Sequence, residues 1–122
     1  MDSPKIFDSE MRFCNILWEH EPITSTELVR LCAQELNWKK STTYTVIKRL
    51  TERGVVKTEN AVVTSLVKKD EAAHSESRAF VDKRFGGSLP SFLAAFTGGK
   101  GISPEEAAEL RRLIDEYEVK EK

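Results

Sequence analysis

The segment Asn37–Val56, NWKKSTTYTVIKRLTERGVV, constrains the fold most strongly because its periodicity changes at Gly54. Residues Ser41–Arg53 follow a helical period, and Gly54 suits the left-handed conformation that often ends a helix. The β-branched residues that follow are typical of a strand. The segment therefore predicts a helix over Ser41–Arg53, capped by Ser41, that leads directly into a strand. The buried side of this helix is predicted to be Thr43, Val46, Ile47 and Leu50.

Two more helices are predicted before this segment and a hairpin after it. DSEMRFCNILWEH predicts a helix capped by Asp8 or Ser9, and TSTELVRLCAQEL predicts a second, in which Thr24 and Glu27 have the spacing of a capping box. The runs VVKTE and VVTSLV, separated by Asn-Ala, predict a tight β-hairpin. Three helices followed by a hairpin is the order of a winged helix-turn-helix, with the third helix for recognition and the hairpin as the wing.

The remainder of the chain is predicted to be helical. KDEAAHSESRAFVDKRF, SLPSFLAAF and SPEEAAELRRLIDEYEVKEK predict three helices, the last capped by Ser103 with Pro104 at its first position. A region as short as residues 70–122 buries too little surface to form a core of its own. We therefore predict a mainly α protein with a small β-hairpin wing, divided into a winged helix-turn-helix domain (1–69) and a helical dimerisation region (70–122). The residues expected at the dimer interface are Phe80, Val81, Phe85, Leu89, Phe92, Leu93, Phe96, Leu110, Leu113, Ile114 and Tyr117.

Positive charge is concentrated around the third predicted helix, although the whole chain carries a formal net charge of -1. Residues 37–57 contain six Lys or Arg and one Glu, whereas residues 70–122 contain eight basic and eleven acidic residues. Such a local patch can attract a polyanion even when the total charge is near zero. The alternative is an ordinary solvated face, but its run of Ser and Thr is unfavourable in a helix without another purpose. The predicted DNA-binding residues are Lys39, Lys40, Ser41, Thr42, Tyr44, Thr45, Lys48, Arg49 and Arg53.

The outward residues of this helix suit different parts of DNA. Thr42 and Thr45 can donate or accept hydrogen bonds at base edges, and their methyl groups can pack on thymine. Tyr44 lies at the flank of this face, so it is expected either to touch DNA or to pack on the wing. Arg49 can contact either a base or a phosphate. The side chains expected to contact phosphates are those of Lys39, Lys40, Lys48 and Arg53.

Other functional classes have little support in the sequence. Cys14 and Cys32 are expected to be free buried thiols, and no metal site or cofactor is expected because His20 and His74 are far apart and no Cys-x-x-Cys pair is present. No Ser/His/Asp or Cys/His set and no phosphate-binding glycine loop indicates an enzyme. The absence of a signal peptide and of a long apolar stretch predicts a cytoplasmic protein that does not bind membranes. A winged-helix module that binds only proteins stays open as the alternative.

Three stretches resemble the BlaI/MecI (penicillinase repressor) family: EMRFCNILW at 10–18, WKKSTTYTVIKRL at 38–50 and RGVV at 53–56. The resemblance extends over about residues 7–117. It implies a cytoplasmic, homodimeric repressor that binds double-stranded DNA at inverted-repeat operators with TACA/TGTA-like half-sites. It also implies that Thr42, Thr45 and Arg49 contact DNA. The tail EVKEK lacks the paired cysteines of copper-responsive relatives, so copper sensing is not expected.

The resemblance further implies a mode of induction. In antibiotic-responsive members, a protease cuts the repressor within its dimerisation region, and the matching bond here is Ala95–Phe96. The glycines that follow in TGGKG should let the end of this short helix fray and admit a protease. The alternative is that Phe96 is an interface or core residue and TGGKG a simple loop.

Overall fold

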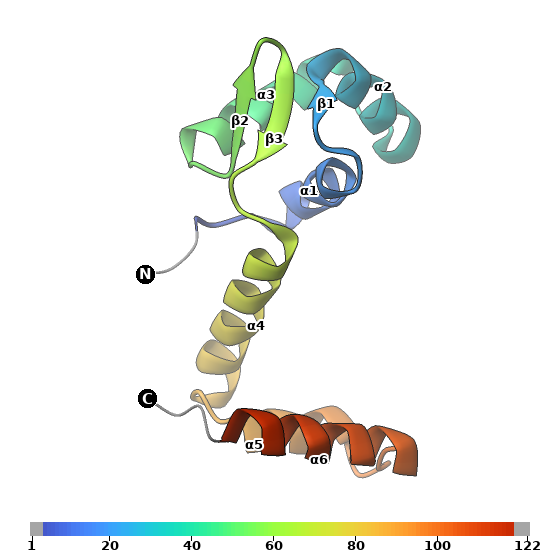
Figure 1. Cartoon of the computed structure of the whole chain (residues 1–122), viewed down its shortest axis with the longest axis vertical. Coiled ribbons are helices and arrows are strands. Elements are labelled where there is room, and N and C mark those ends of the chain that lie inside the picture. Colours follow the sequence, from blue (N-terminus) through green and yellow to red (C-terminus); the bar gives the residue numbers. More distant parts are fainter. Residues whose placement is uncertain (1–3, 119–122) are drawn as a thin grey trace. The chain divides into compact units, whose positions relative to one another are not determined.

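The computed structural model describes residues 4–118, and this part of the chain forms six helices and a three-stranded sheet (Figure 1). It divides into two compact units, Met1–Ala79 and Phe80–Lys122. The predicted fold class, mainly α with a β-hairpin wing, is confirmed. The elements are α1 (Asp8–His20), β1 (Ile23–Thr24), α2 (Ser25–Leu36), α3 (Lys40–Glu52), β2 (Val56–Glu59), β3 (Val62–Ser65), α4 (Lys69–Phe85), α5 (Leu89–Thr97) and α6 (Pro104–Glu118).

The predicted hairpin forms two of the three strands of the sheet, and its second strand, β3, is central in the order β1-β3-β2. Strands β2 and β3 pair antiparallel, and Asn60 and Ala61 turn the chain between them with φ values of 53° and 66°. Positive φ at both central residues is the requirement of a type I′ turn, whose twist matches that of the strands. Strand β1 pairs with β3 and was missed in the sequence, because two residues are too short to show an alternating pattern.

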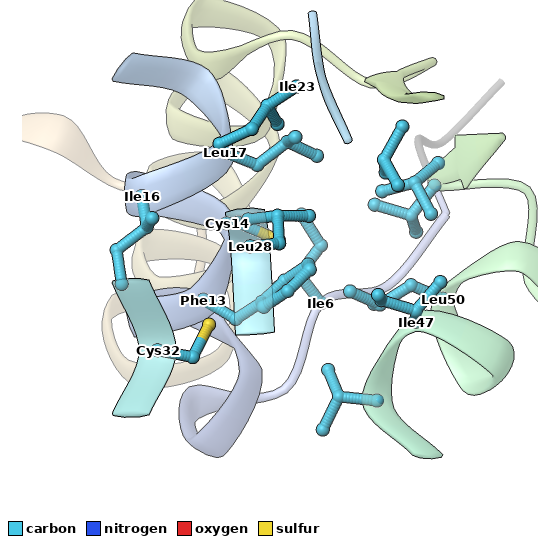
Figure 2. Close-up of a cluster of buried hydrophobic side chains, with 14 of the residues drawn as sticks. Ile6, Phe13, Cys14, Ile16, Leu17, Ile23, Leu28, Cys32, Ile47 and Leu50 are labelled. Atoms are coloured by element: carbon cyan, nitrogen blue, oxygen red, sulfur yellow. The ribbon is translucent and has the colours of Figure 1, made fainter. Parts of the chain in front are cut away.

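The first unit is built around one apolar core between α1, α2, α3 and the sheet. Figure 2 shows Phe13, Leu17, Leu28 and Leu50 within this core, and these four side chains are fully shielded from solvent. Burial of one such side chain stabilises the fold by about 1.5–3 kcal/mol. The predicted inner side of the third helix, Thr43, Val46, Ile47 and Leu50, is buried as expected.

Two predicted helix starts are wrong. Helix α1 is capped by Phe7 instead of Asp8 or Ser9, because the Glu10 carboxylate reaches back and accepts from the Phe7 N–H at 3.0 Å. Helix α3 is capped by Lys39 instead of Ser41. The first backbone hydrogen bond of the helix runs from the Thr43 N–H to the Lys39 carbonyl at 3.1 Å. Ser41 is exposed and already lies within the first turn.

The cap predicted for the second helix is confirmed in part. The Thr24 hydroxyl accepts from the Glu27 N–H at 3.1 Å, as a capping box requires. The Glu27 carboxylate, however, binds the guanidinium of Arg30 on the next turn. Hydrogen bonding to Arg30 lowers the pKa of Glu27, so this carboxylate is held in its charged form.

Polar contacts fasten the sheet to α1. The Trp18 indole donates to the Val67 carbonyl at 3.0 Å. The Glu21 carboxylate accepts from both the backbone N–H and the hydroxyl of Ser65, each at 2.7 Å, and it lies 3.7 Å from the Lys68 ammonium. These bonds join the end of α1 to the end of β3, so they fix the hairpin relative to the helices.

The second unit has no comparable core. Its centre is a group of four phenylalanines, Phe80, Phe85, Phe92 and Phe96, whose neighbouring ring centroids lie 5.6–6.1 Å apart. Ser103 caps α6 as predicted, since its hydroxyl accepts from the Glu106 N–H at 3.0 Å. No side chain among residues 80–117 is fully buried. The unit therefore leaves much of its apolar surface in contact with solvent.

The two cysteines are free and buried, as predicted. Burial raises the pKa of the Cys14 thiol to about 12. It also raises the pKa of Cys32, and the nearby Thr43 hydroxyl only partly offsets that rise. Both thiols are therefore neutral near pH 7 and unreactive as nucleophiles. Nowhere in residues 4–118 is there a helix with the length and apolar character needed to cross a membrane.

Candidate nucleic-acid interface

Helix α3 presents one continuous polar face because its other face is locked into the core. Leu50 and Thr43 are completely buried, and Val46 and Ile47 are 7% exposed. A helix held on one side in this way must direct its remaining side chains outward. The exposed residues of α3 and of Lys39 before it are Lys39, Lys40, Ser41, Thr42, Tyr44, Thr45, Lys48, Arg49, Thr51 and Glu52.

Residues 4–118 do not neutralise the cations of this face. Lys39, Lys40, Lys48 and Arg49 form no ion pair with any residue that the structure describes. Their charges are therefore available to an external anion, and long cationic side chains beside short hydroxyl residues match the phosphates and base edges of a major groove. The N-terminal turn of α3 adds backbone N–H groups that favour a phosphate.

Tyr44 lies at the flank of the polar face. Its side chain is 39% exposed, so it is covered in part by the protein and still reaches solvent. The structure thus leaves the ring accessible to DNA, and its contact with DNA stays a prediction.

Arg53 faces inward, unlike the other predicted contacts. Its guanidinium pairs with the buried carboxylate of Glu10, and its Nε donates to the Lys5 carbonyl at 3.2 Å. The guanidinium carbon also lies 4.8 Å from the ring centroid of Phe7. The predicted phosphate contact of Arg53 stays a prediction, and the structure gives this side chain a second role in holding the N-terminal segment against α3. Glu10 was missed because, in the sequence, it is only one more acid in a first helical turn.

The wing contributes little net charge. Lys57 on β2 pairs with Glu59 at 3.8 Å, and Lys57 is the one basic residue between Val55 and Val67. The carbonyl of Ala61 at the tip accepts from the Ser25 N–H at 2.9 Å, which joins the turn of the wing to the start of α2. The positive charge of the interface therefore lies mainly on α3.

The predicted dimer residues form the exposed apolar surface of the second unit. Four of them are partly buried: Val81, Phe85, Phe92 and Leu110. The other seven are exposed, from 36% to 71%: Phe80, Leu89, Leu93, Phe96, Leu113, Ile114 and Tyr117.

The proposed cleavage position lies in this second unit, near the end of α5. Ala95 is exposed and Phe96 is 71% exposed, two residues before the left-handed Gly98 that ends the helix. The C-terminal end of the predicted last helix, from residue 119, and with it most of the tail EVKEK, lies outside the described residues.

Comparison with known proteins identifies the family. The profile of the penicillinase repressor family matches residues 6–116. The chain is 26% identical to the penicillinase repressor of Bacillus licheniformis, across 98% of this chain and 96% of that protein. It is 25% identical to the methicillin resistance regulatory protein MecI of Staphylococcus aureus, across 91% of this chain and 94% of that protein.

A comparison of structures found the solution structure of the DNA binding domain of the repressor BlaI, with a TM-score of 0.49 and 24% sequence identity, covering 58% of this chain and 93% of that chain. The family assignment rests on the sequence profile, which matches most of the chain. This protein therefore belongs to the penicillinase repressor family, a family of DNA-binding repressors.

Proposed function

We propose that this protein is a dimeric, sequence-specific transcriptional repressor that binds inverted-repeat operators in double-stranded DNA. The observation that carries the proposal is the outward face of α3, where unpaired cations and short hydroxyl side chains lie together on a helix held rigidly by its buried side. Residues 1–69 are proposed to read DNA, and residues 70–122 are proposed to join two copies.

The roles on α3 follow from side-chain chemistry. Thr42 and Thr45 are proposed to read base edges, with Arg49 at a base or a phosphate. Lys39, Lys40 and Lys48 are proposed to contact phosphates, and these contacts set the position of the helix without selecting a sequence. The remaining proposed DNA contacts are Ser41, Tyr44, Arg53 and the backbone N–H groups in the first turn of α3.

The exposed apolar surface of the second unit supports dimerisation. Phe96, Ile114 and Tyr117 are each more than half exposed, and apolar surface of this extent usually marks an interface. An inverted-repeat operator needs two recognition helices roughly 34–36 Å apart, which a two-fold dimer provides. Sedimentation equilibrium should give a dimer at micromolar concentration. A stable monomer, unchanged by added operator, would contradict this part of the proposal.

DNA binding is tested with two substitutions on the exposed face. Thr45→Ala should reduce discrimination at one base position by about 1–3 kcal/mol per half-site, because one base contact is lost. Lys48→Ala should weaken binding to operator and random duplexes alike and reduce the dependence of affinity on salt. The measurement is fluorescence anisotropy with a duplex from the protein's own upstream region and a shuffled duplex of equal length.

The same titration distinguishes the proposed DNA-binding repressor from the alternative function. A winged-helix module that binds only proteins would show no salt-dependent binding to either duplex. If unaltered protein and both variants bind the two duplexes equally weakly, α3 is not a recognition helix.

Relief of repression by proteolysis between Ala95 and Phe96 is the second part of the proposal, and it is supported by the exposure of both residues beside the end of α5. A cut there would detach α6 from the rest of the interface, so that the two half-sites could no longer be bound together. Cells exposed to a cell-wall antibiotic should accumulate the shortened repressor on an immunoblot. Full-length repressor during induction of the target genes would show that another signal ends repression.

A further inference from the structure

The N-terminal segment Pro4–Phe7 is held against the C-terminal end of α3. Ile6 is 8% exposed and belongs to the core, so it anchors the middle of the segment. On the outer side, Arg53 donates to the Lys5 carbonyl at 3.2 Å and lies over the Phe7 ring at 4.8 Å. The segment is thus fixed by one buried apolar side chain and by the last residue of the recognition-helix region.

The free positive charge at this end of α3 belongs to Lys5. The charge of Arg53 is compensated by the Glu10 carboxylate, to which it is paired. The Lys5 ammonium lies 5.4 Å from the Phe7 ring centroid, and it forms no ion pair within residues 4–118, including with Asp8 at the start of α1. An exposed cation without a carboxylate partner is suited to a phosphate.

The position of Lys5 is set by α3. Arg49 lies in the last turn of α3, and Arg53 follows the helix directly as its C-terminal cap. Arg49 is exposed and is one of the proposed DNA contacts, whereas Arg53 holds the backbone of Lys5. Lys5 is therefore held beside the C-terminal end of α3, the helix whose exposed face carries Lys48 and Arg49.

We propose that Lys5 is an additional phosphate contact of the DNA interface, and that the Glu10–Arg53 pair positions the N-terminal segment for it. This inference rests on the proposed DNA binding. Lys5 adds affinity without sequence preference, because an ammonium group on a phosphate carries no base information.

The experiment measures affinity for the upstream duplex and the shuffled duplex between about 50 and 200 mM salt. Lys5→Ala keeps the backbone carbonyl that binds Arg53, so the fold should be retained. The variant should show a salt slope smaller by about one per bound protomer, which over this range is a change of about threefold in relative affinity. Lys5→Arg should keep the original slope, and Lys100→Ala, in the loop after α5, should have no effect.

The positioning role has its own readout. Glu10→Gln with Arg53→Met should lower the slope at least as much as Lys5→Ala does, and adding Lys5→Ala to this double variant should lower it no further. A slope for Lys5→Ala equal to that of the unaltered protein overturns the inference while leaving the proposed function intact. Absence of salt-dependent binding by the unaltered protein overturns both.

Discussion

The pair between Glu10 and Arg53 should contribute measurably to stability, and Arg53→Met tests it directly. The Glu10 side chain is 5% exposed and that of Arg53 is 28% exposed. Removal of one partner from a fully buried ion pair costs about 3–5 kcal/mol, because the remaining charge is left without compensation. Since Arg53 is partly solvated, and Glu10 keeps the hydrogen bond from the Phe7 N–H, we expect a loss of about 2–3 kcal/mol in the free energy of unfolding.

A double-mutant cycle isolates the interaction. Glu10→Gln removes the charge but leaves an amide oxygen that can still accept from the Phe7 N–H, so its cost should be smaller than that of Arg53→Met. In the double variant neither charge is left unpaired. Its loss in the free energy of unfolding should therefore be smaller than the sum of the two single losses by about 1–2 kcal/mol.

Urea unfolding followed by tryptophan fluorescence is the assay, because Trp18 and Trp38 both pack against the core of the first unit. Arg30→Met is the matched control. It breaks an exposed pair with Glu27 on the surface of α2, and the midpoint should stay where it is. Strict additivity of the two substitutions, or an Arg53→Met variant within about 0.5 kcal/mol of the unaltered protein, would show that the pair does not stabilise the fold.

Three further outcomes follow from local features. Thr43→Val should raise the free energy of unfolding by less than about 1 kcal/mol in thermal unfolding, because the buried Thr43 hydroxyl has only the Cys32 thiol, a weak partner, beside it and makes no hydrogen bond of normal geometry with the described residues; a lower midpoint would mean that the hydroxyl is satisfied. Ala61→Gly should raise the thermal midpoint and increase the free energy of unfolding by about 1 kcal/mol, because Ala61 has a φ of 66°, which glycine adopts without strain. A lower midpoint would show that the turn is not strained. The pKa of Cys14 is raised from 9.0 to about 12, so its contribution to stability is complete below pH 9 and is lost as the pH rises toward 12, because only the unfolded thiol ionises there. At pH 8, Cys14 should react with a disulfide reagent only on unfolding, and rapid labelling of folded protein would contradict its burial.

Local sequence determined the helical parts of this protein and the division of α3 into two faces. The spacing of Thr43, Val46, Ile47 and Leu50 is sufficient to place the core side, and the polar residues between them must then face outward. Asn60-Ala61 between two β-branched runs determined the hairpin in the same way. These features depend on residues within a few positions of one another, so they can be read without knowledge of the rest of the chain.

The tertiary structure decided what depends on residues far apart in the sequence. Strand β1 exists because Ile23 meets Val63, and Arg53 turns inward because Glu10 lies beside it, 43 residues earlier in the chain. Similarly, periodicity identified the apolar residues of the second unit, but only the fold shows that no side chain among residues 80–117 is fully buried. Propensity and spacing describe each segment alone, whereas the pairing of a buried charge and the exposure of an apolar face are set by which segments the folded core brings together.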